Sequence, residues 1–202
     1  MIAHALGAGA TRIVPIEGID EAKALKAAHP DWLLIGERHA RRLPGFDCGN
    51  SPAEVLAVAD LAGRTVVHTT HAGTQGLAAA ARVADVVLTG AFVNAAATVR
   101  HVRALAPREV TIVAMGHEAR ERCVEDDLCR ELLRARLLDE PFDERRIVPE
   151  LRAAPAALKF FDPAADWAPE GDFALCSALD QIDFAVQLRR QPEGFLALER
   201  VG

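Results

Sequence analysis

The densest group of polar side chains lies at residues 36–52, which carry three arginines, one histidine, two carboxylates and one asparagine. Arginine guanidinium groups bind phosphate and carboxylate through paired hydrogen bonds. The segment runs into Ser51-Pro52-Ala53-Glu54, a helix start with an N-cap serine, a proline suited to the first helical position and a glutamate that can close a capping box. Because a helix N-terminus attracts anions, these residues predict an oxyanion site. The alternative is a solvated loop whose helix start binds no ligand.

A second helix start and an acidic cluster add to this chemistry. Gly73-Thr74 begins a predicted helix, and a glycine there lets the backbone approach a phosphate closely. Glu125, Asp126 and Asp127 are consecutive carboxylates early in another predicted helix. They either interact favourably with the helix dipole or supply oxygen ligands to Mg²⁺.

The cysteines, histidines and late aspartates give weaker signals. Cys129 is expected to be a small buried hydrophobe, with a reactive thiolate as the alternative. The cysteines show no closely paired metal spacing, which argues against a zinc site or a disulfide framework; they are Cys48, Cys123, Cys129 and Cys176. Four histidines are candidates for a general acid or base, namely His39, His68, His71 and His117. Asp180 and Asp183 precede a predicted strand and are expected to cap a helix or form a turn.

The composition fits a single domain over residues 1–202, since half of the residues are hydrophobic and the chain is long enough to bury a core. A formal charge of −6 argues against nucleic acid as a partner, because phosphate contacts need a basic face. No apolar run is long enough to cross a bilayer, and the first residues lack the pattern of a secretion signal. We therefore expect a cytoplasmic protein with reduced thiols that binds neither nucleic acid nor a membrane.

Short apolar runs alternate with segments of helical periodicity along the chain. Strands are expected at residues 12–16, 32–35, 65–69, 85–88, 110–114, 184–188 and 195–198. Helices are expected at residues 1–8, 20–28, 51–63, 74–82, 94–105 (capped by Asn94) and 124–138, with short helices and loops at 139–171. This order predicts an α/β fold with three layers, α/β/α, around a mixed, largely parallel sheet that ends in a C-terminal β-hairpin.

In sheets of this class, ligands bind beyond the carboxyl ends of the strands. The loops at residues 36–50, 69–74, 90–94 and 116–125 are therefore expected to be neighbours. The arginine-rich segment, the Gly73-Thr74 helix start and the acidic cluster would then meet at one edge of the sheet.

Several motifs occur in a characteristic order. The most specific is Gly-Phe-Asp-x-Gly-Asn-Ser-Pro at residues 45–52, preceded by Gly36-Glu37-Arg38. Thr69-Thr70-His71-Ala72-Gly73-Thr74-Gln75-Gly76 follows. The later motifs are Gly90 with Asn94, Glu125-Asp126 with Leu128-Cys129, Cys176, Leu179-Asp180 and Asp183-Phe184. Over nearly the whole chain, this order resembles the 2-phosphosulfolactate phosphatase (ComB-like) family.

The resemblance implies an α/β, Mg²⁺-dependent hydrolase that acts on the phosphate monoester of a small 2-hydroxy acid. The family's named reaction releases sulfolactate and phosphate on a route to coenzyme M. The resemblance maps substrate and phosphate binding onto Glu37, Arg38, Asn50, Ser51, Gly73, Thr74 and Asn94. It maps catalysis onto Asp47, Glu125, Asp126 and Cys129, of which Asp47, Glu125 and Asp126 are also the candidate Mg²⁺ ligands.

This sequence departs from the family pattern in two places. Family members open with a strand carrying an Asp-x-x-Arg-Ala-type motif, which has no counterpart before Met1, so the chain is expected to be truncated relative to the family. The missing strand would expose a sheet edge or leave a gap for a second copy in a homodimer. His71-Ala72 and Gln75 replace residues of the Thr-Asn-Gly-Thr-Arg version that many members carry, so the substrate need not be 2-phosphosulfolactate. The alternative function is a degenerate, non-catalytic homologue that binds a small anionic ligand.

Overall fold

A computed structural model of the chain describes residues 1–57 and 60–202. Its contacts group into two compact units. The first unit comprises Met1–Thr89 and Val186–Arg200, and the second comprises Gly90–Ala185 and Val201–Gly202. Among the described residues, no helix combines the length and the apolar character needed to span a membrane.

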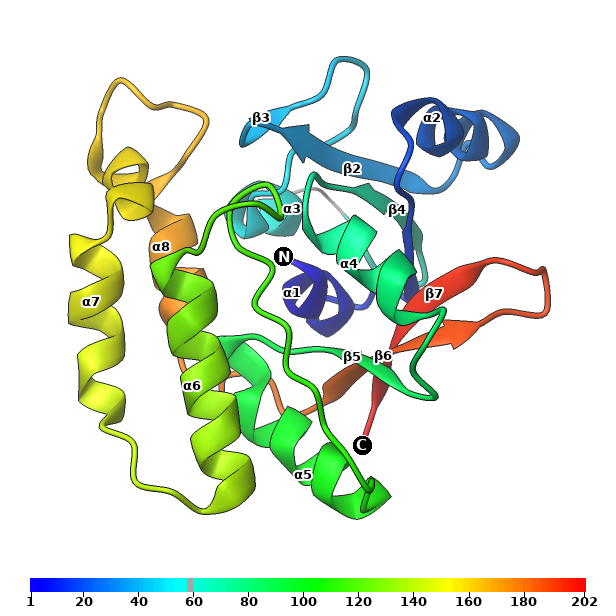
Figure 1. The fold of residues 1–202 in the computed structure, drawn as a ribbon. Helices are drawn as coiled ribbons and strands as arrows, with labels where there is room; N and C mark the ends of the chain where they lie inside the picture. The colour runs from blue at the N-terminus through cyan, green and yellow to red at the C-terminus, as the bar shows by residue number, and fades with distance from the viewer. Residues whose placement is uncertain (58–59) are drawn as a thin grey trace. The chain divides into compact units, whose positions relative to one another are not determined.

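The first unit is built on a mixed sheet (Figure 1). Its strands are β1 (Arg12–Pro15), β2 (Leu33–Arg38), β3 (Arg41–Arg42), β4 (Thr65–Thr69), β5 (Val87–Thr89), β6 (Ala185–Arg190) and β7 (Leu196–Val201). Seven strands follow the order β3-β2-β4-β1-β7-β6-β5 without interruption. β4 pairs in parallel with β1 and β2, whereas β1–β7, β2–β3 and β5–β6 pair antiparallel. The parallel core of the sheet is therefore β2-β4-β1.

Apolar residues cover both faces of this parallel core. Alternate residues of a strand point to opposite faces, and every residue of β4 is buried. Val14 and Val67 pack with Ala22 on one face, whereas Ile13 and Val66 are fully buried on the other. The helices of this unit are α1 (Ile2–Gly7), α2 (Ile19–Ala28), α3 (Pro52–Ala57) and α4 (Gly73–Ala80). Ala22 belongs to α2, and α1 packs against β1 and α3.

The second unit is helical. It contains η1 (Phe92–Asn94), α5 (Ala95–Leu105), α6 (Val124–Leu138), η2 (Glu144–Arg146), α7 (Ile147–Ala153), η3 (Pro155–Phe161) and α8 (Glu170–Ser177). Its core joins Val99 of α5 to Leu128 and Leu132 of α6 and to Ile147 and Leu151 of α7. The helix predicted at residues 124–138 is α6, and its buried residues are Leu128, Leu132, Leu133 and Ala135.

Most predicted elements are confirmed. The α/β class, the mixed sheet and the C-terminal hairpin of β6 and β7 are present, as are the short helices between residues 139 and 171. The predicted loop at residues 36–50 is partly wrong, because β2 extends to Arg38 and turns into the antiparallel strand β3. The prediction that the third helix passes through Ala59 lies outside the described residues.

The strand predicted at residues 110–114 is wrong. These residues have no regular secondary structure, and no strand in the described part of the chain pairs with them. Val113 is 67% exposed and Val110 is 46% exposed, so the apolar run is not buried as a central strand must be. A short β-branched run indicates a strand only where a neighbouring strand can bond to it.

Candidate active site

The carboxyl ends of β2 and β4 lie side by side in the first unit. Gly36 of β2 is in register with Thr69 of β4. A Cβ atom on Gly36 would lie 2.6 Å from the Thr69 carbonyl oxygen and 2.8 Å from Cε1 of Phe46. Real Cβ atoms do not approach that closely, so only glycine fits at this position. The glycine of the Gly36-Glu37-Arg38 motif thus brings the residues that follow β2 close to those that follow β4.

Arg38 is anchored at this end of the sheet. Its Nη1 donates to the Glu37 carbonyl oxygen at 2.7 Å. Its Nη2 donates to the Glu17 carbonyl oxygen at 3.2 Å and to Thr69 Oγ1 at 3.1 Å. These bonds use three of the five guanidinium N–H donors, and the Nε–H is not among them. The guanidinium is therefore held in place while keeping donors for an anion.

The Glu37 carboxylate bonds both the turn after β2 and the loop after β4. Its Oε2 accepts a hydrogen bond from the Ala40 N–H at 2.7 Å, and its Oε1 accepts one from the His71 N–H at 3.4 Å. One bond closes the turn between β2 and β3, and the other reaches the loop after β4. A carboxylate that bonds two backbone N–H groups is occupied in positioning the loops. The resemblance assigned Glu37 to substrate binding, and this role stays a prediction.

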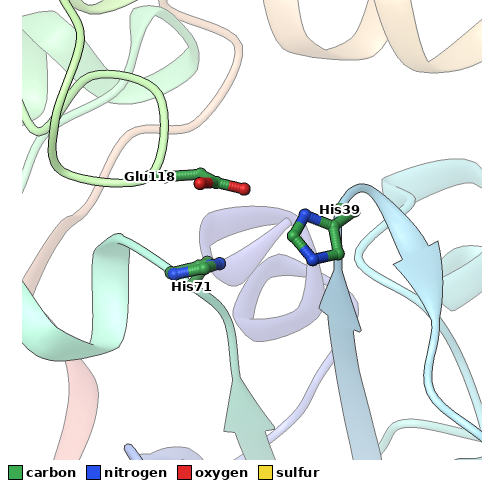
Figure 2. A group of neighbouring side chains, drawn as sticks. All are labelled: His39, His71 and Glu118. Atoms are coloured by element: carbon green, nitrogen blue, oxygen red, sulfur yellow. The ribbon is translucent and has the colours of Figure 1, made fainter.

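Two histidines face each other across these loops. The rings of His39 and His71 have centroids 5.9 Å apart and meet edge to face at 65° (Figure 2). His39 and Ala40 both adopt left-handed backbone conformations, with φ of 52° and 61°. A turn of this kind normally takes Asn-Gly, because side chains with a Cβ atom disfavour positive φ. Glu118, also drawn in Figure 2, belongs to the second unit.

Helix α4 begins without a side-chain cap. Its N-cap residue is Ala72, and no side chain accepts a hydrogen bond from its first turn. Thr74 is 2% exposed. Its hydroxyl donates a hydrogen bond to the carbonyl oxygen of Thr70, which precedes the helix, at 2.8 Å. What α4 offers a ligand is therefore its first backbone N–H groups, which have no partner within the helix. The prediction for Gly73 and Thr74 accordingly rests on their backbone.

Asn50 pairs with a buried histidine of β4. The Asn50 Oδ1 lies 3.0 Å from Nε2 of His68, which is 4% exposed. Burial lowers the pKa of His68 from 6.5 to about 3, so this imidazole is neutral near pH 7. A neutral imidazole with Nε2 donating to Asn50 would orient the amide side chain.

Ser51 and Glu54 organise the start of α3. The Ser51 Oγ accepts from the Glu54 N–H at 3.0 Å, which confirms the predicted N-cap. The Glu54 carboxylate accepts from the Gly49 N–H at 2.7 Å and pairs with Arg42 at 3.2 Å. The observed contacts of Ser51 are thus those of a helix cap, and its assignment to substrate binding stays a prediction.

Asp47 lies beside the middle of β2. Its Oδ2 accepts from the Leu34 N–H at 2.8 Å and lies 3.1 Å from Nζ of Lys26. Leu34 is four residues before Arg38 on the same strand, and a strand rises about 3.3 Å per residue. The structure therefore does not bring Asp47 together with Arg38. The ammonium of Lys26 would compete with a metal ion, so a Mg²⁺ ligand role for Asp47 requires Lys26 to move.

The acidic cluster opens helix α6 in the second unit. Asp126 Oδ2 accepts from the Gly116 N–H at 2.6 Å. Asp127 is ion-paired with Arg122 at 3.0 Å and with Arg130 at 3.3 Å. Gly116 has φ of +69°, and a Cβ there would lie 2.1 Å from the Glu121 carbonyl oxygen, so this turn requires glycine. The three neighbouring carboxylates therefore differ in their charge partners. Arg122 and Arg130 neutralise Asp127, whereas within the described residues they pair with neither Glu125 nor Asp126.

Asp180, and not Asn94, provides the side-chain cap of α5, in keeping with the capping role predicted for Asp180. Asn94 starts α5, but its Oδ1 accepts from the Ala91 N–H and its Nδ2 donates to the Phe184 carbonyl oxygen. The predicted side-chain cap by Asn94 is therefore wrong. Asp180 supplies the cap, since its Oδ1 accepts from the Ala96 N–H at 2.7 Å. Asn94 instead joins two segments that are far apart in the sequence.

Cys129 packs against the core of the second unit. Burial raises the pKa of its thiol to about 12, so the thiolate is negligible near pH 7. This environment matches the expected small buried hydrophobe and opposes the alternative of a reactive thiolate.

Sequence reasoning missed the residues that position others. Thr69 and the Glu17 carbonyl oxygen hold Arg38, and neither was singled out for that role. Nothing in the sequence marks a backbone carbonyl 21 residues upstream as a partner. The spacing of Glu37 and Ala40, three residues apart around a turn, is a signal that could have indicated the carboxylate-to-backbone bond.

Comparison with known proteins adds independent information. The sequence profile of the family described as 2-phosphosulpholactate phosphatase matches residues 1–191. A protein of Deinococcus radiodurans named probable 2-phosphosulfolactate phosphatase is 44% identical over 112 residues, covering 55% of this chain and 46% of that protein. A protein of Synechococcus with the same name is 32% identical over 202 residues, covering 90% of this chain and 81% of that protein. One of Bacillus subtilis, again so named, is 26% identical over 195 residues, covering 95% and 83%.

The matches differ in the share of each relative that this chain covers. The chain spans about half the length of the Deinococcus radiodurans relative and about four fifths of the Synechococcus relative. Of these three matches, the one with the highest identity is the shortest.

Proposed function

We propose that this chain, which belongs to the 2-phosphosulfolactate phosphatase family, hydrolyses the phosphate monoester of a small 2-hydroxy acid in a Mg²⁺-dependent reaction. The substrate is 2-phosphosulfolactate or a related compound. The observation that carries the proposal is the arrangement at the carboxyl ends of β2 and β4. Within the described residues, an anchored arginine that keeps unused N–H donors is bonded there, through Thr69, to the loop that leads into a helix start without a side-chain cap.

The first unit binds the dianion in this proposal. Arg38 donates to the ester or acid oxygens through the N–H groups that Glu17, Glu37 and Thr69 leave unused. The first backbone N–H groups of α4, at Gly73 and Thr74, bind the phosphate oxygens and add the positive end of the helix dipole. Both groups are held before the substrate arrives, and phosphoryl transfer depends mainly on such positioning and charge neutralisation.

Glu125 and Asp126 of the second unit hold Mg²⁺ in this proposal. Carboxylate oxygens are the ligands that Mg²⁺ prefers, and within the described residues the Asp126 carboxylate accepts one N–H bond, which leaves lone pairs for a metal. A bound Mg²⁺ would supply the Lewis acid of a metal-dependent hydrolysis. Asp127 is excluded from this role because two arginines already pair with it.

The proposal is tested by release of inorganic phosphate from a panel of esters. The panel contains 2-phosphosulfolactate, 2-phospholactate and 2-phosphoglycerate, with 4-nitrophenyl phosphate as a generic ester. We expect release from at least one 2-hydroxy acid ester in Mg²⁺, little release in EDTA, and weaker activity on the generic ester. A lack of metal-dependent release from every ester would contradict the proposal.

The same panel addresses the alternative of a non-catalytic homologue. Calorimetry of each ester, without a chemical readout, measures binding alone. Binding in the micromolar range with no product formed would favour an anion-binding protein that has lost turnover. Detectable turnover by this chain would exclude that alternative.

A further inference from the structure

We infer that His39 and His71 form a binding site for a borderline divalent transition metal ion such as Zn²⁺, Ni²⁺ or Co²⁺. The inference concerns binding alone and does not depend on the proposed phosphatase activity. It uses neither Glu125 nor Asp126, the residues proposed to hold Mg²⁺.

The distance between the two rings suits a shared ion. A ring nitrogen of His39 and one of His71 lie within 4.8 Å of each other. Two nitrogens on one tetrahedral zinc ion, each about 2.0–2.1 Å from the metal, are separated by roughly 3.4 Å. Because His39 is exposed, a small rotation of its ring closes this difference. Imidazole nitrogen is a preferred ligand for zinc, nickel and cobalt and a poor one for Mg²⁺.

The backbone around both histidines is fixed in advance. Glu37 bonds the N–H of Ala40, next to His39, and the N–H of His71 itself. The left-handed conformations of His39 and Ala40 are unfavourable for residues other than glycine. In this turn they present the His39 ring toward His71 (Figure 2). The fixed backbone lowers the entropy lost when both rings bind one ion.

A carboxylate lies beside the two histidines. Successive side chains of a strand point to opposite faces, so Glu37 and Arg38 leave β2 on different sides. The Glu37 carboxylate is on the side of His71, to which it bonds. The Arg38 guanidinium is directed to the Glu17 carbonyl oxygen and Thr69. A carboxylate is therefore bonded to the backbone of one of the two histidines, and the Arg38 guanidinium is bonded elsewhere.

The inference is tested on the untagged chain after treatment with a chelator. Calorimetry with Zn²⁺ and absorption spectroscopy with Co²⁺ measure affinity and the nature of the ligands. We expect one ion per chain, no competition by Mg²⁺, and affinity at least about tenfold weaker in both His39→Ala and His71→Ala. His29→Ala is the matched control, because it removes an exposed histidine that stacks on Trp32 instead, and its affinity should be unchanged.

A measurement on the unaltered chain covers the case that a variant fails to fold. The imidazole ¹⁵N signals of His39 and His71 should shift together on titration with Zn²⁺, whereas those of His29 should not. Wild-type affinity in both His39→Ala and His71→Ala would overturn the inference. Zinc-induced shifts confined to other histidines would also overturn it.

Discussion

Arg38 is the residue on which the proposed anion site depends most. Its three observed bonds fix the guanidinium plane, and the sequence alone indicated only that an arginine near a helix start suits an anion. That general chemistry was predictable for Arg38, Gly73 and Thr74. The partners were not, because Glu17 reaches Arg38 through a backbone atom whose position depends on the fold.

Arg38→Lys tests this residue directly. Lysine keeps the charge but has only three N–H donors and no planar fork, so it cannot keep the bonds to Glu17, Glu37 and Thr69 and also bond a phosphate. We expect kcat/KM for the best ester to fall by at least about tenfold, in line with the loss of a charged hydrogen bond of about 1.5–3 kcal/mol. Arg41→Lys, on the neighbouring strand β3, is the control. Equal losses in both variants would show that the effect is not specific to Arg38.

His68 gives a prediction for stability against pH. Its pKa is lowered by burial from 6.5 to about 3, so between these values the unfolded chain binds a proton that the folded chain does not. The free energy of unfolding should therefore decrease as the pH falls below about 6.5, by up to roughly 1.4 kcal/mol per pH unit from this residue. Above pH 6.5 His68 is neutral in both states and has no effect on the slope.

The comparison with His68→Gln isolates this contribution. Chemical denaturation at several pH values between 4 and 7 yields the slope for each protein, whatever the offset in stability. We expect a shallower slope for His68→Gln below pH 6.5 and parallel curves above it. Identical slopes throughout the acid range would mean that His68 titrates normally in the folded chain.

At the scale of elements, the close approach of β2 and β4 creates the site. Alternation of apolar runs and helical periodicity was enough to predict both strands. It was not enough to exclude a strand at residues 110–114, because the same composition is found where no neighbouring strand bonds to it. The extension of β2 to Arg38 was also missed, since Gly36 and Glu37 are poor strand formers that tertiary pairing overrides.

Gly36→Ala tests the approach of the two strands. The added Cβ would lie 2.6 Å from the Thr69 carbonyl oxygen, a backbone atom that cannot rotate away. We expect the free energy of unfolding to fall by about 3 kcal/mol. Gly18→Ala is the control, since its nearest neighbour would be at 3.7 Å, and it should lose at most about 1 kcal/mol. Denaturant titration of both variants checks this, and a loss in Gly36→Ala no larger than the control's would refute the argument.

At the scale of the whole molecule, the α/β class followed from the order of elements, whereas the division into two units did not. The boundaries fall at Thr89–Gly90 and Ala185–Val186, where the sequence shows no change in composition. They reflect the density of contacts, which becomes visible only once the chain is folded. The proposed function assigns anion binding to the first unit and Mg²⁺ binding to the second, so each role is tested by its own variants.

Glu125→Gln and Asp126→Asn test the role of the second unit. Each removes a charged oxygen ligand, so we expect the Mg²⁺ concentration for half-maximal activity, or the Kd for Mg²⁺ by calorimetry, to rise about tenfold or more. Asp127→Asn is the matched control, because Arg122 and Arg130 already neutralise that carboxylate. If all three variants keep the wild-type dependence on Mg²⁺, the metal is held elsewhere.

The location of the bound anion is tested most directly by amide chemical shifts of the whole chain during titration with inorganic phosphate, a product of the proposed reaction. This measurement needs no turnover. The account predicts that the backbone N–H signals of Gly73 and Thr74 and the Nε–H signal of Arg38 shift together with one dissociation constant. Saturable shifts confined to residues outside these loops, with Arg38 and the start of α4 unmoved, would contradict it.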